Sequence, residues 1–208
     1  MVNKSKTIDT GTETKILRAA KEIFHVYGFQ GARMQQIADK AGINKALLHY
    51  YFRDKKKLFN AVFTDAINKF FPPLLELVSE KNVSLFDKIR KFVDYQIQML
   101  KDNTYIASFI VNEFNQNPDK AVKLFSHEGK YLPKVFIDQV TDAKKKGLII
   151  DIEPFELIIN IVSLNVFPIL NKQIMKSMFS MSENKYNKFL DSRKKTAAEF
   201  IIRSIRKK

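Results

Sequence analysis

The sequence of 208 residues contains no cysteine. This absence excludes disulfide bonds, thiolate catalysis and cysteine metal sites, and it suits a reducing compartment. Glycine and proline are also scarce, with 6 of each, whereas 45% of the residues are hydrophobic and 18 are phenylalanine. The composition therefore excludes a disordered chain and predicts one or two domains with a helical, aromatic-filled interior.

Long apolar runs are missing as well. The first fifteen residues contain no apolar stretch, so no secretory signal is predicted. The longest apolar segment, residues 155–170, contains Glu156 and Pro168. It is also shorter than the roughly 20 residues that cross a bilayer as a helix. We therefore expect a cytoplasmic protein with no membrane helix.

Motifs of catalysis and metal binding are absent from the sequence. The three histidines, His25, His49 and His127, have no metal-ligand spacing such as that of an HExxH motif. The sequence contains no Gly-rich phosphate loop, nucleophile elbow or carboxylate pair among convergent polar residues. We therefore expect no enzyme, no metal and no cofactor.

Acidic residues are fewer than basic ones, 22 Asp and Glu against 36 Lys and Arg, so the formal net charge is +14. Residues 1–57 hold 12 Lys and Arg against 5 Asp and Glu, and the remaining 151 residues hold 24 against 17. The positive charge per residue is therefore highest near the N-terminus, as a polyanionic partner would favour. A generally lysine-rich surface is the alternative, and composition alone does not choose between them.

A helix-turn-helix pattern occupies residues 28–59. Residues 34–41 carry apolar side chains at i, i+3, i+4 and i+7, which predicts an amphipathic helix. Gly42 can adopt the left-handed conformation that a tight turn needs. Asn44 can cap a second helix over residues 45–51, whose outer face is suited to a DNA major groove.

The same region resembles the N-terminal domain of the TetR family, the tetracycline-repressor-like transcriptional regulators. The matching segments, about the first quarter of the chain, are Thr14–Phe24, Gly28-Phe29, Ile37-Ala38, Ala41-Gly42-Ile43, Leu48–Phe52, Asp54-Lys55 and Leu58-Phe59. The resemblance implies an all-helical dimer that binds a palindromic operator and releases it when a small molecule enters the C-terminal domain. Ala32-Arg33 departs from the family, which usually has a capping Thr or Ser here, although Arg33 can still meet a phosphate.

The residues expected to contact DNA lie on the outer side of this motif. They are Arg33, Gln35, Lys45, Ala46, Leu47, His49, Tyr50, Tyr51 and Lys55. The resemblance implies that Lys45 contacts a base or a phosphate, His49 is expected at the groove edge, and Lys55 at a phosphate near a helix N-terminus. Leu47 could fill a core position instead of contacting the groove. Tyr51 could lie either in the core or at a phosphate. The polar arm of residues 1–9 could reach DNA or simply fray.

The expected fold is all-α, with a helix-turn-helix domain over residues 1–57 and a helical ligand-sensing and dimerisation domain over residues 58–208. Asp54 can cap the helix that links them, and Pro72-Pro73 is expected to break or kink it. The later helices are expected at about 84–101, 104–117, 118–147 with interruptions near 129 and 133, 153–179, and 182 to the C-terminus.

A homodimer is expected through the last two helices, about residues 155–205. Residues 157–170 are apolar nearly all round, so this helix needs cover on two sides. In the final helix, Ala197 and Ala198 permit close approach of a partner. The family resemblance implies a four-helix dimer bundle; a central helix in a monomer is the alternative.

A small-molecule site is expected within residues 84–180. Helical patterning turns aromatic and scattered polar side chains inward there: Phe92, Tyr95, Met99, Phe109, Asn112, Glu113, Phe136 and Asn165. Ordinary core packing is the alternative for most of them. The three polar members need partners, which an amphipathic ligand could supply. The basic domain favours an anionic ligand and Glu113 a cationic one, so the charge of the effector stays open.

The sequence therefore predicts a TetR-like DNA-binding regulator, a repressor that binds double-stranded operator DNA as a homodimer and responds to an unknown small-molecule effector. A protein of the same fold that binds small molecules or partners, with little sequence-specific DNA binding, is the alternative. A peripheral membrane protein attracted by its basic charge is a third hypothesis.

Overall fold

The computed structural model of the protein describes residues 10–126 and 133–207. The N-terminal arm and His127 lie outside this part of the chain. Within it the protein is all-α, as expected, and its elements are α1 (Thr10–Gly31), α2 (Met34–Ala41), α3 (Lys45–Tyr51), α4 (Lys55–Ser79), α5 (Leu85–Asp102), α6 (Thr104–Gln116), α7 (Pro118–Ser126), α8 (Lys134–Lys145), α9 (Pro154–Leu170), α10 (Lys172–Met178) and α11 (Glu183–Ile205). In these ranges the β-structure is an isolated antiparallel bridge between Ile149 and Arg206.

The chain divides into two compact units, unit 1 to Asn68 and unit 2 from Lys69. The division lies within α4, later than the boundary at residue 57 expected from the sequence. The first half of α4 packs on α1, because the Phe59 ring meets the Phe24 ring edge-on at 5.0 Å between centroids. An ion pair of 3.0 Å between Lys21 and Asp65 joins the same two helices.

The core of unit 1 is built from the apolar faces of its four helices. Phe24, Ile37, Leu48 and Leu58 are buried, one from each of α1 to α4. Helix α1 is interrupted at Gly28, whose φ of 63° lies in the left-handed region that glycine tolerates. The ranges of α2 and α3 are those predicted.

The sequence predicted a break or a kink at Pro72-Pro73, and the structure shows no break, since both prolines lie inside α4. Proline fixes φ near the helical value, so two prolines remove backbone donors without forcing the chain out of the helix. The C-terminal end of α4 is held by the buried Lys88, whose Nζ donates to the Val78 carbonyl at 2.9 Å. Burial lowers the pKa of Lys88.

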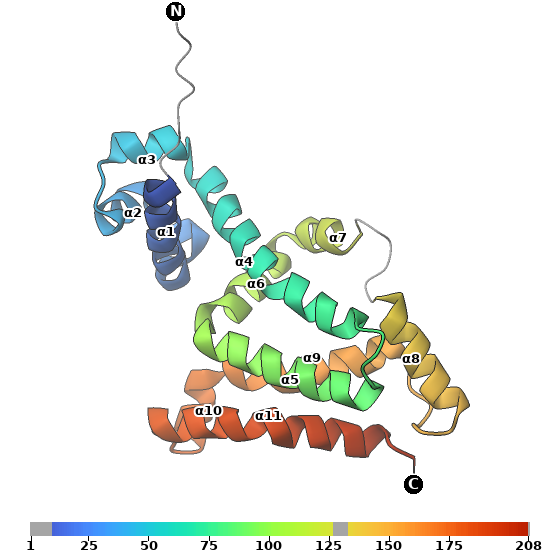
Figure 1. Ribbon diagram of the computed structural model, residues 1–208. Coiled ribbons are helices and arrows are strands. Elements are labelled where there is room, and N and C mark those ends of the chain that lie inside the picture. Colours follow the sequence, from blue (N-terminus) through green and yellow to red (C-terminus); the bar gives the residue numbers. More distant parts are fainter. Residues whose placement is uncertain (1–9, 127–132, 208) are drawn as a thin grey trace, which may run out of the picture. The chain divides into compact units, whose positions relative to one another are not determined.

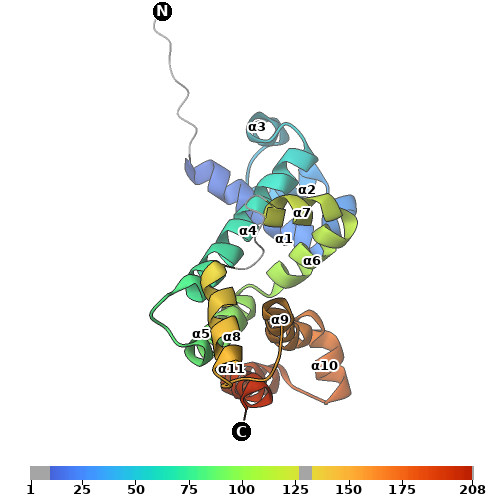
Figure 2. The ribbon, with the colours of Figure 1, turned by 90° about the vertical axis from the view of Figure 1, so that its right-hand side faces the viewer.

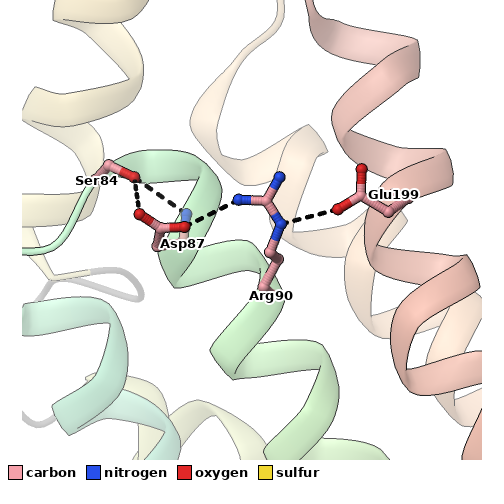
Figure 3. Close-up of polar contacts among 4 residues, drawn as sticks. All are labelled: Ser84, Asp87, Arg90 and Glu199. Carbon is pink, nitrogen blue, oxygen red and sulfur yellow. Dashed lines mark hydrogen bonds and ion pairs between the residues drawn. The ribbon is translucent and has the colours of Figure 1, made fainter.

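In unit 2, helices α5, α9 and α11 pack against one another. They lie side by side in Figure 1 and form a triangle when viewed nearly end-on in Figure 2. Arg90 of α5 joins α5 to α11 by a 2.8 Å ion pair with Glu199, and its other end meets Asp87 at 2.9 Å (Figure 3). Ser84 caps α5, its hydroxyl oxygen accepting from the Asp87 N–H.

The prediction of a single helix over residues 153–179 is wrong, because the structure has two helices, α9 and α10, that meet at a bend of 72°. Pro168 has no N–H for the Leu164 carbonyl one turn earlier. That carbonyl instead accepts two hydrogen bonds from the Arg193 guanidinium, at 2.7 and 3.2 Å. The Pro168 carbonyl accepts from the Tyr186 hydroxyl at 2.9 Å. Side chains of α11 therefore satisfy backbone groups that the proline and the bend would leave without partners.

No single helix in the described ranges is long and apolar enough to cross a membrane. Helices α9 and α10 reach the length and apolar composition of a membrane-spanning segment only when they are counted together, across their bend.

Candidate nucleic-acid interface and apolar cavity

The turn between α2 and α3 is fixed by short-range hydrogen bonds. Gly42 is left-handed, with φ 68° and ψ 34°, and its N–H donates to the Asp39 carbonyl at 3.1 Å. The Ile43 N–H donates to the Ala38 carbonyl at 3.0 Å. Asn44 then caps α3, its Oδ1 accepting from the Leu47 N–H at 2.7 Å. A helix of seven residues is unstable alone, so this turn and the buried contacts of its neighbours hold α3 in place.

The outer face of α3 is available to a partner. Lys45, Ala46, His49 and Tyr50 are exposed, while Leu48 between them is fully buried in unit 1. Leu47 is 37% exposed, which places it outside the core. Tyr51 is half-buried, and its ring meets the Tyr50 ring edge-on at 5.6 Å.

The His49 ring is oriented by the backbone at the end of α3. Its Nδ1 lies 3.0 Å from the Arg53 carbonyl oxygen. A carbonyl only accepts, so Nδ1 carries the proton and Nε2 is the acceptor of the neutral ring. This tautomer can accept a hydrogen bond from the amino group of cytosine or adenine in a major groove.

Lys55 has a structural role that sequence reasoning missed. Its Nζ donates to the carbonyls of Gln30 and Ala32, at 3.3 and 3.0 Å, and lies 4.7 Å from the centroid of the Phe29 ring. An ammonium has three donors, so one remains for a phosphate. The neighbouring Lys56 is exposed on the first turn of α4, where helix amides also favour an anion.

The two expected residues around α2 differ in how they are held. Arg33 is exposed at the N-cap position and makes no side-chain cap, as its departure from the family pattern implied; its N–H donates to Gln36 Oε1 at 2.9 Å. Gln35 is exposed, and its amide donates to Asp39 Oδ1 at 2.8 Å. The second Nε2 hydrogen and the Oε1 of Gln35 can still meet DNA while this hydrogen bond is kept.

Unit 2 contains an apolar cavity of about 880 Å³. Its nineteen lining residues come from α4, α5, α6, α8 and α9: Phe70, Phe71, Leu74, Leu75, Val78, Phe92, Gln96, Leu100, Ala107, Ile110, Val111, Phe114, Ile137, Pro154, Phe155, Ile158, Ile159, Val162 and Val166. The volume lies within the range of about 300–1,000 Å³ typical of small-molecule sites.

Phe92 is the one member of the expected ligand set that lines this cavity. Asn165 is buried beside it and donates to Gln96, a lining residue, at 2.9 Å. The others lie elsewhere: Tyr95, Met99 and Phe109 are half-buried outside the wall, and Phe136 is core. Spacing of four and seven residues along α9 could have identified Phe155, Ile159 and Val166, but the wall contributed by α4 depends on packing.

The two remaining polar candidates are explained without a ligand. Asn112 is exposed, contrary to the inward position expected, because the buried positions of α6 are 106, 107, 110 and 113. Glu113 is buried, and its carboxylate accepts from Lys120 Nζ at 2.6 Å and from the Asn117 amide at 3.0 Å. Its charge is therefore paired within the protein.

The expected dimer contacts in α11 also require correction. Ala197, Ala198 and Ile201 are buried within the chain itself, because α11 turns this side toward α5 and α9. A different set of side chains is exposed on α9, α10 and α11 and their ends, and we call it the outward apolar face: Phe167, Leu170, Ile174, Met178, Phe179 and Phe200. Exposed apolar groups on contacting helices are typical of an interaction surface.

Metal ligands are not gathered anywhere in the described residues, where no three His, Asp or Glu side chains are placed to hold an ion. The two features that stand out are therefore the exposed α3 and the cavity of unit 2.

The described residues therefore combine a helix-turn-helix near the N-terminus with a helical second unit that contains an apolar cavity. Residues 16–62 match the model of the bacterial regulatory proteins of the tetR family.

Two curated relatives are transcriptional regulators from Escherichia coli strain K12. The chain is 31% identical over 87 residues to the HTH-type transcriptional regulator RutR, a match covering 42% of this chain and 40% of RutR. It is 26% identical over 158 residues to the HTH-type transcriptional regulator UidR, covering 71% of this chain and 74% of UidR.

A solved structure extends the likeness in fold over nearly the whole chain. The crystal structure of HlyIIR, a hemolysin II transcriptional regulator, superimposes with a TM-score of 0.63 at 22% identity, covering 95% of this chain and 98% of that chain. A likeness at this level of identity establishes the fold.

Proposed function

We propose that this protein is a transcriptional repressor that binds a palindromic DNA operator as a homodimer and releases it when a small molecule binds unit 2. The observation that carries the proposal is the outer face of α3, which exposes Lys45, His49 and Tyr50 while Leu48 fixes the helix to the core. A repressor of chromosomal genes would act in the cytoplasm.

In this proposal α3 lies in the major groove. Lys45 and the Nε2 acceptor of His49 meet base edges, whereas Lys55 and Lys56 meet phosphates at the start of α4. Ala46 and Leu47 have no polar side-chain atoms and would contact thymine methyl groups. Two protomers related by a two-fold axis would place their α3 helices about 34–36 Å apart, one turn of DNA.

The outward apolar face supplies the proposed dimer contact. Its phenylalanines are exposed in the single chain, with Phe167 at 61% and Phe200 at 62%. Burial of these rings against their two-fold copies would provide the central apolar contact that a stable interface needs. We place this contact within residues 155–205, on the parts of α9 to α11 that face away from α5.

The cavity supplies the proposed effector site. Five of its lining residues, from Phe70 to Val78, belong to α4, the helix that begins at Lys55. A ligand that repositions this part of α4 would act on the helix that carries the phosphate contacts. Such a ligand weakens DNA binding only if it favours the conformation that binds DNA poorly.

The test is selection of genomic fragments bound by the full chain, followed by titration of the selected palindrome and of random duplex. Lys45→Ala and His49→Ala should each weaken operator binding by about 1–3 kcal/mol more than random binding. Lys56→Ala should weaken both alike and flatten the salt slope by roughly one unit. Lys185→Ala, which removes an exposed lysine of α11, is the charge-matched control.

Lys55→Ala should weaken binding to both duplexes and also lower the melting temperature of the protein, since this lysine holds the end of α1. Binding that is equally strong to every duplex and insensitive to the α3 variants would refute the proposal. It would favour the alternative, a small-molecule or partner-binding protein with this fold.

A further inference from the structure

We propose that His49 reads one operator base through its Nε2 atom, and that protonation of the ring changes which base it prefers. A neutral ring would select a base that presents an amino group, such as cytosine, and a charged ring would select guanine. The inference rests on the proposed operator binding and adds a dependence of the preferred operator sequence on pH.

The ring of His49 is held by the backbone that follows α3. Its Nδ1 lies 3.0 Å from the carbonyl oxygen of Arg53, four residues later. A carbonyl oxygen only accepts, so Nδ1 carries a proton whether the ring is neutral or charged. The change of protonation is therefore confined to Nε2, which accepts a hydrogen bond in the neutral ring and donates one in the charged ring.

The Arg53 carbonyl is a firm anchor because both of its neighbours in the chain are held. On one side, Phe52 is 8% exposed and belongs to the core. On the other side, Asp54 Oδ1 accepts from the Lys57 N–H at 2.7 Å and so caps α4. A His49 ring tied to this carbonyl is ordered before DNA arrives, which lowers the entropic cost of using it as a reader.

The Nε2 atom is left for the groove. His49 is exposed on the outer face of α3, and the Arg53 carbonyl is the ring's one hydrogen-bond partner among residues 10–126 and 133–207. Lys45, one turn earlier, is exposed as well, whereas Leu48 is buried in unit 1. A base edge that meets this face of α3 would therefore meet an Nε2 atom whose hydrogen-bonding capacity is still open.

The charge of the ring depends on the groups around it. The charged side chains on α2, α3, the connection to α4 and the first turn of α4 that lie nearest in sequence are Asp39, Lys40, Lys45, Arg53, Asp54, Lys55, Lys56 and Lys57. The carboxylates of Asp39 and Asp54 already accept hydrogen bonds from the Gln35 amide and the Lys57 N–H. The six cations favour a neutral ring, and DNA phosphates favour a charged one. Histidine changes charge between about pH 5 and 8, so pH in this window selects the state.

Each state of Nε2 matches a different base edge in the major groove. Cytosine presents an amino donor there, from which the neutral ring can accept. Guanine presents two acceptors, O6 and N7, to which the charged ring can donate. Adenine carries a donor and an acceptor and suits both states. The exchange of cytosine for guanine is therefore the sharpest comparison.

The experiment titrates the full chain with variants of its selected operator. The base read by His49 is located as the position where His49→Ala loses the preference of the unmodified protein. Affinities for duplexes with cytosine or guanine there, in both half-sites, are measured at about pH 8 and about pH 5.5. Their ratio at each pH cancels the phosphate contacts, which both duplexes share. We expect cytosine to be preferred at the higher pH and guanine at the lower, with the ratio changing at least about tenfold, or about 1.4 kcal/mol.

Two variants and one spectroscopic measurement locate the effect. His49→Gln keeps a polar side chain that does not titrate, so its base preference should be the same at both pH values. His25→Gln removes an exposed histidine of α1 and is the matched control, which should keep the pH-dependent ratio. Nitrogen NMR of the imidazole in the free protein measures the tautomer directly, and we expect the neutral His49 ring to be protonated at Nδ1.

The outcomes separate this inference from the proposed function. Operator binding with one base preference at both pH values, or with no position altered by His49→Ala, would overturn the inference and leave the DNA-binding proposal standing. A ratio that still changes with pH in His49→Gln, or a neutral ring protonated at Nε2, would overturn the assignment to His49. Failure to select any duplex would overturn the proposed function and this inference with it.

Discussion

The side chain of Phe200 offers the sharpest test of how two protomers would associate. Phe200 is 62% exposed on α11, whereas Ala197, less than one turn earlier, is 4% exposed. The two positions therefore distinguish an outer surface of α11 from its internal surface. We expect Phe200→Asp to dissociate the proposed dimer into folded monomers and Ala197→Asp to unfold the protomer.

The magnitude follows from the exposed area of the ring. A phenylalanine side chain buries about 200 Å² when fully covered, so roughly 120 Å² of Phe200 remains to be covered by a partner. At about 25 cal/mol per Å² this is about 3 kcal/mol for each protomer, or about 6 kcal/mol for a symmetric pair. Part of this is lost to ordering and imperfect packing. We expect the dimer Kd to rise by at least about a thousandfold, or about 4 kcal/mol.

The expected loss of folding stability in Ala197→Asp comes from the burial of this position within the protomer. A carboxylate at this position has no counter-ion provided for it, and leaving such a charge buried destabilises a fold by about 3–5 kcal/mol. Sedimentation over a range of concentrations measures the dimer, and circular dichroism with thermal melting measures the fold. Lys195→Asp, on the exposed side of the same helix, controls for the added negative charge.

Two results would refute this reasoning. If Phe200→Asp stays dimeric at micromolar concentration with an unchanged Kd, the outward apolar face is not the dimer contact. If Ala197→Asp folds normally and dissociates, the original expectation of an interface at the alanine pair is right and the assignment of surfaces is inverted.

Three further substitutions test the links between helices in unit 2. Two lysines of α10 hold the pKa of Glu183 at about 2, so its stabilisation is present above pH 4.5 and lost as the pH falls through about 2. The difference in melting temperature between the unmodified protein and Glu183→Gln should therefore vanish near pH 2, and a constant difference would contradict it. Tyr186→Phe leaves the Pro168 carbonyl without its donor and should lower the free energy of unfolding in urea by about 1–2 kcal/mol; no loss would show that the bend does not need this hydrogen bond. Burial lowers the pKa of Lys88, so between that lowered value and 10.5 the unfolded chain binds more protons and stability rises with pH. Lys88→Met should abolish that rise in urea titrations between pH 8 and 10.5, and an unchanged slope would exclude Lys88 as its source.

The local architecture of the helix-turn-helix could be predicted from the sequence, because each of its signals acts over a few residues. Gly42 tolerates the left-handed turn, and Asn44 supplies an oxygen three residues before the amide that it caps. The period of the apolar residues then determines which face of α2 is buried. Such features need no knowledge of distant segments, and they gave both the ranges of α2 and α3 and the exposed side of α3.

The tertiary structure decided which partner each side chain finds. Lys55 meets the carbonyls that end α1, and Ala197 faces inward rather than toward a second chain. Gln96 enters the cavity wall and joins Asn165, 69 residues away. These outcomes depend on how helices distant in sequence pack, and helical periodicity shows that a face is buried but not what buries it. The sequence by itself therefore determined the helix-turn-helix and the exposed side of α3, while the packing of α4 to α11 determined the lining of the cavity and which apolar side chains stay exposed.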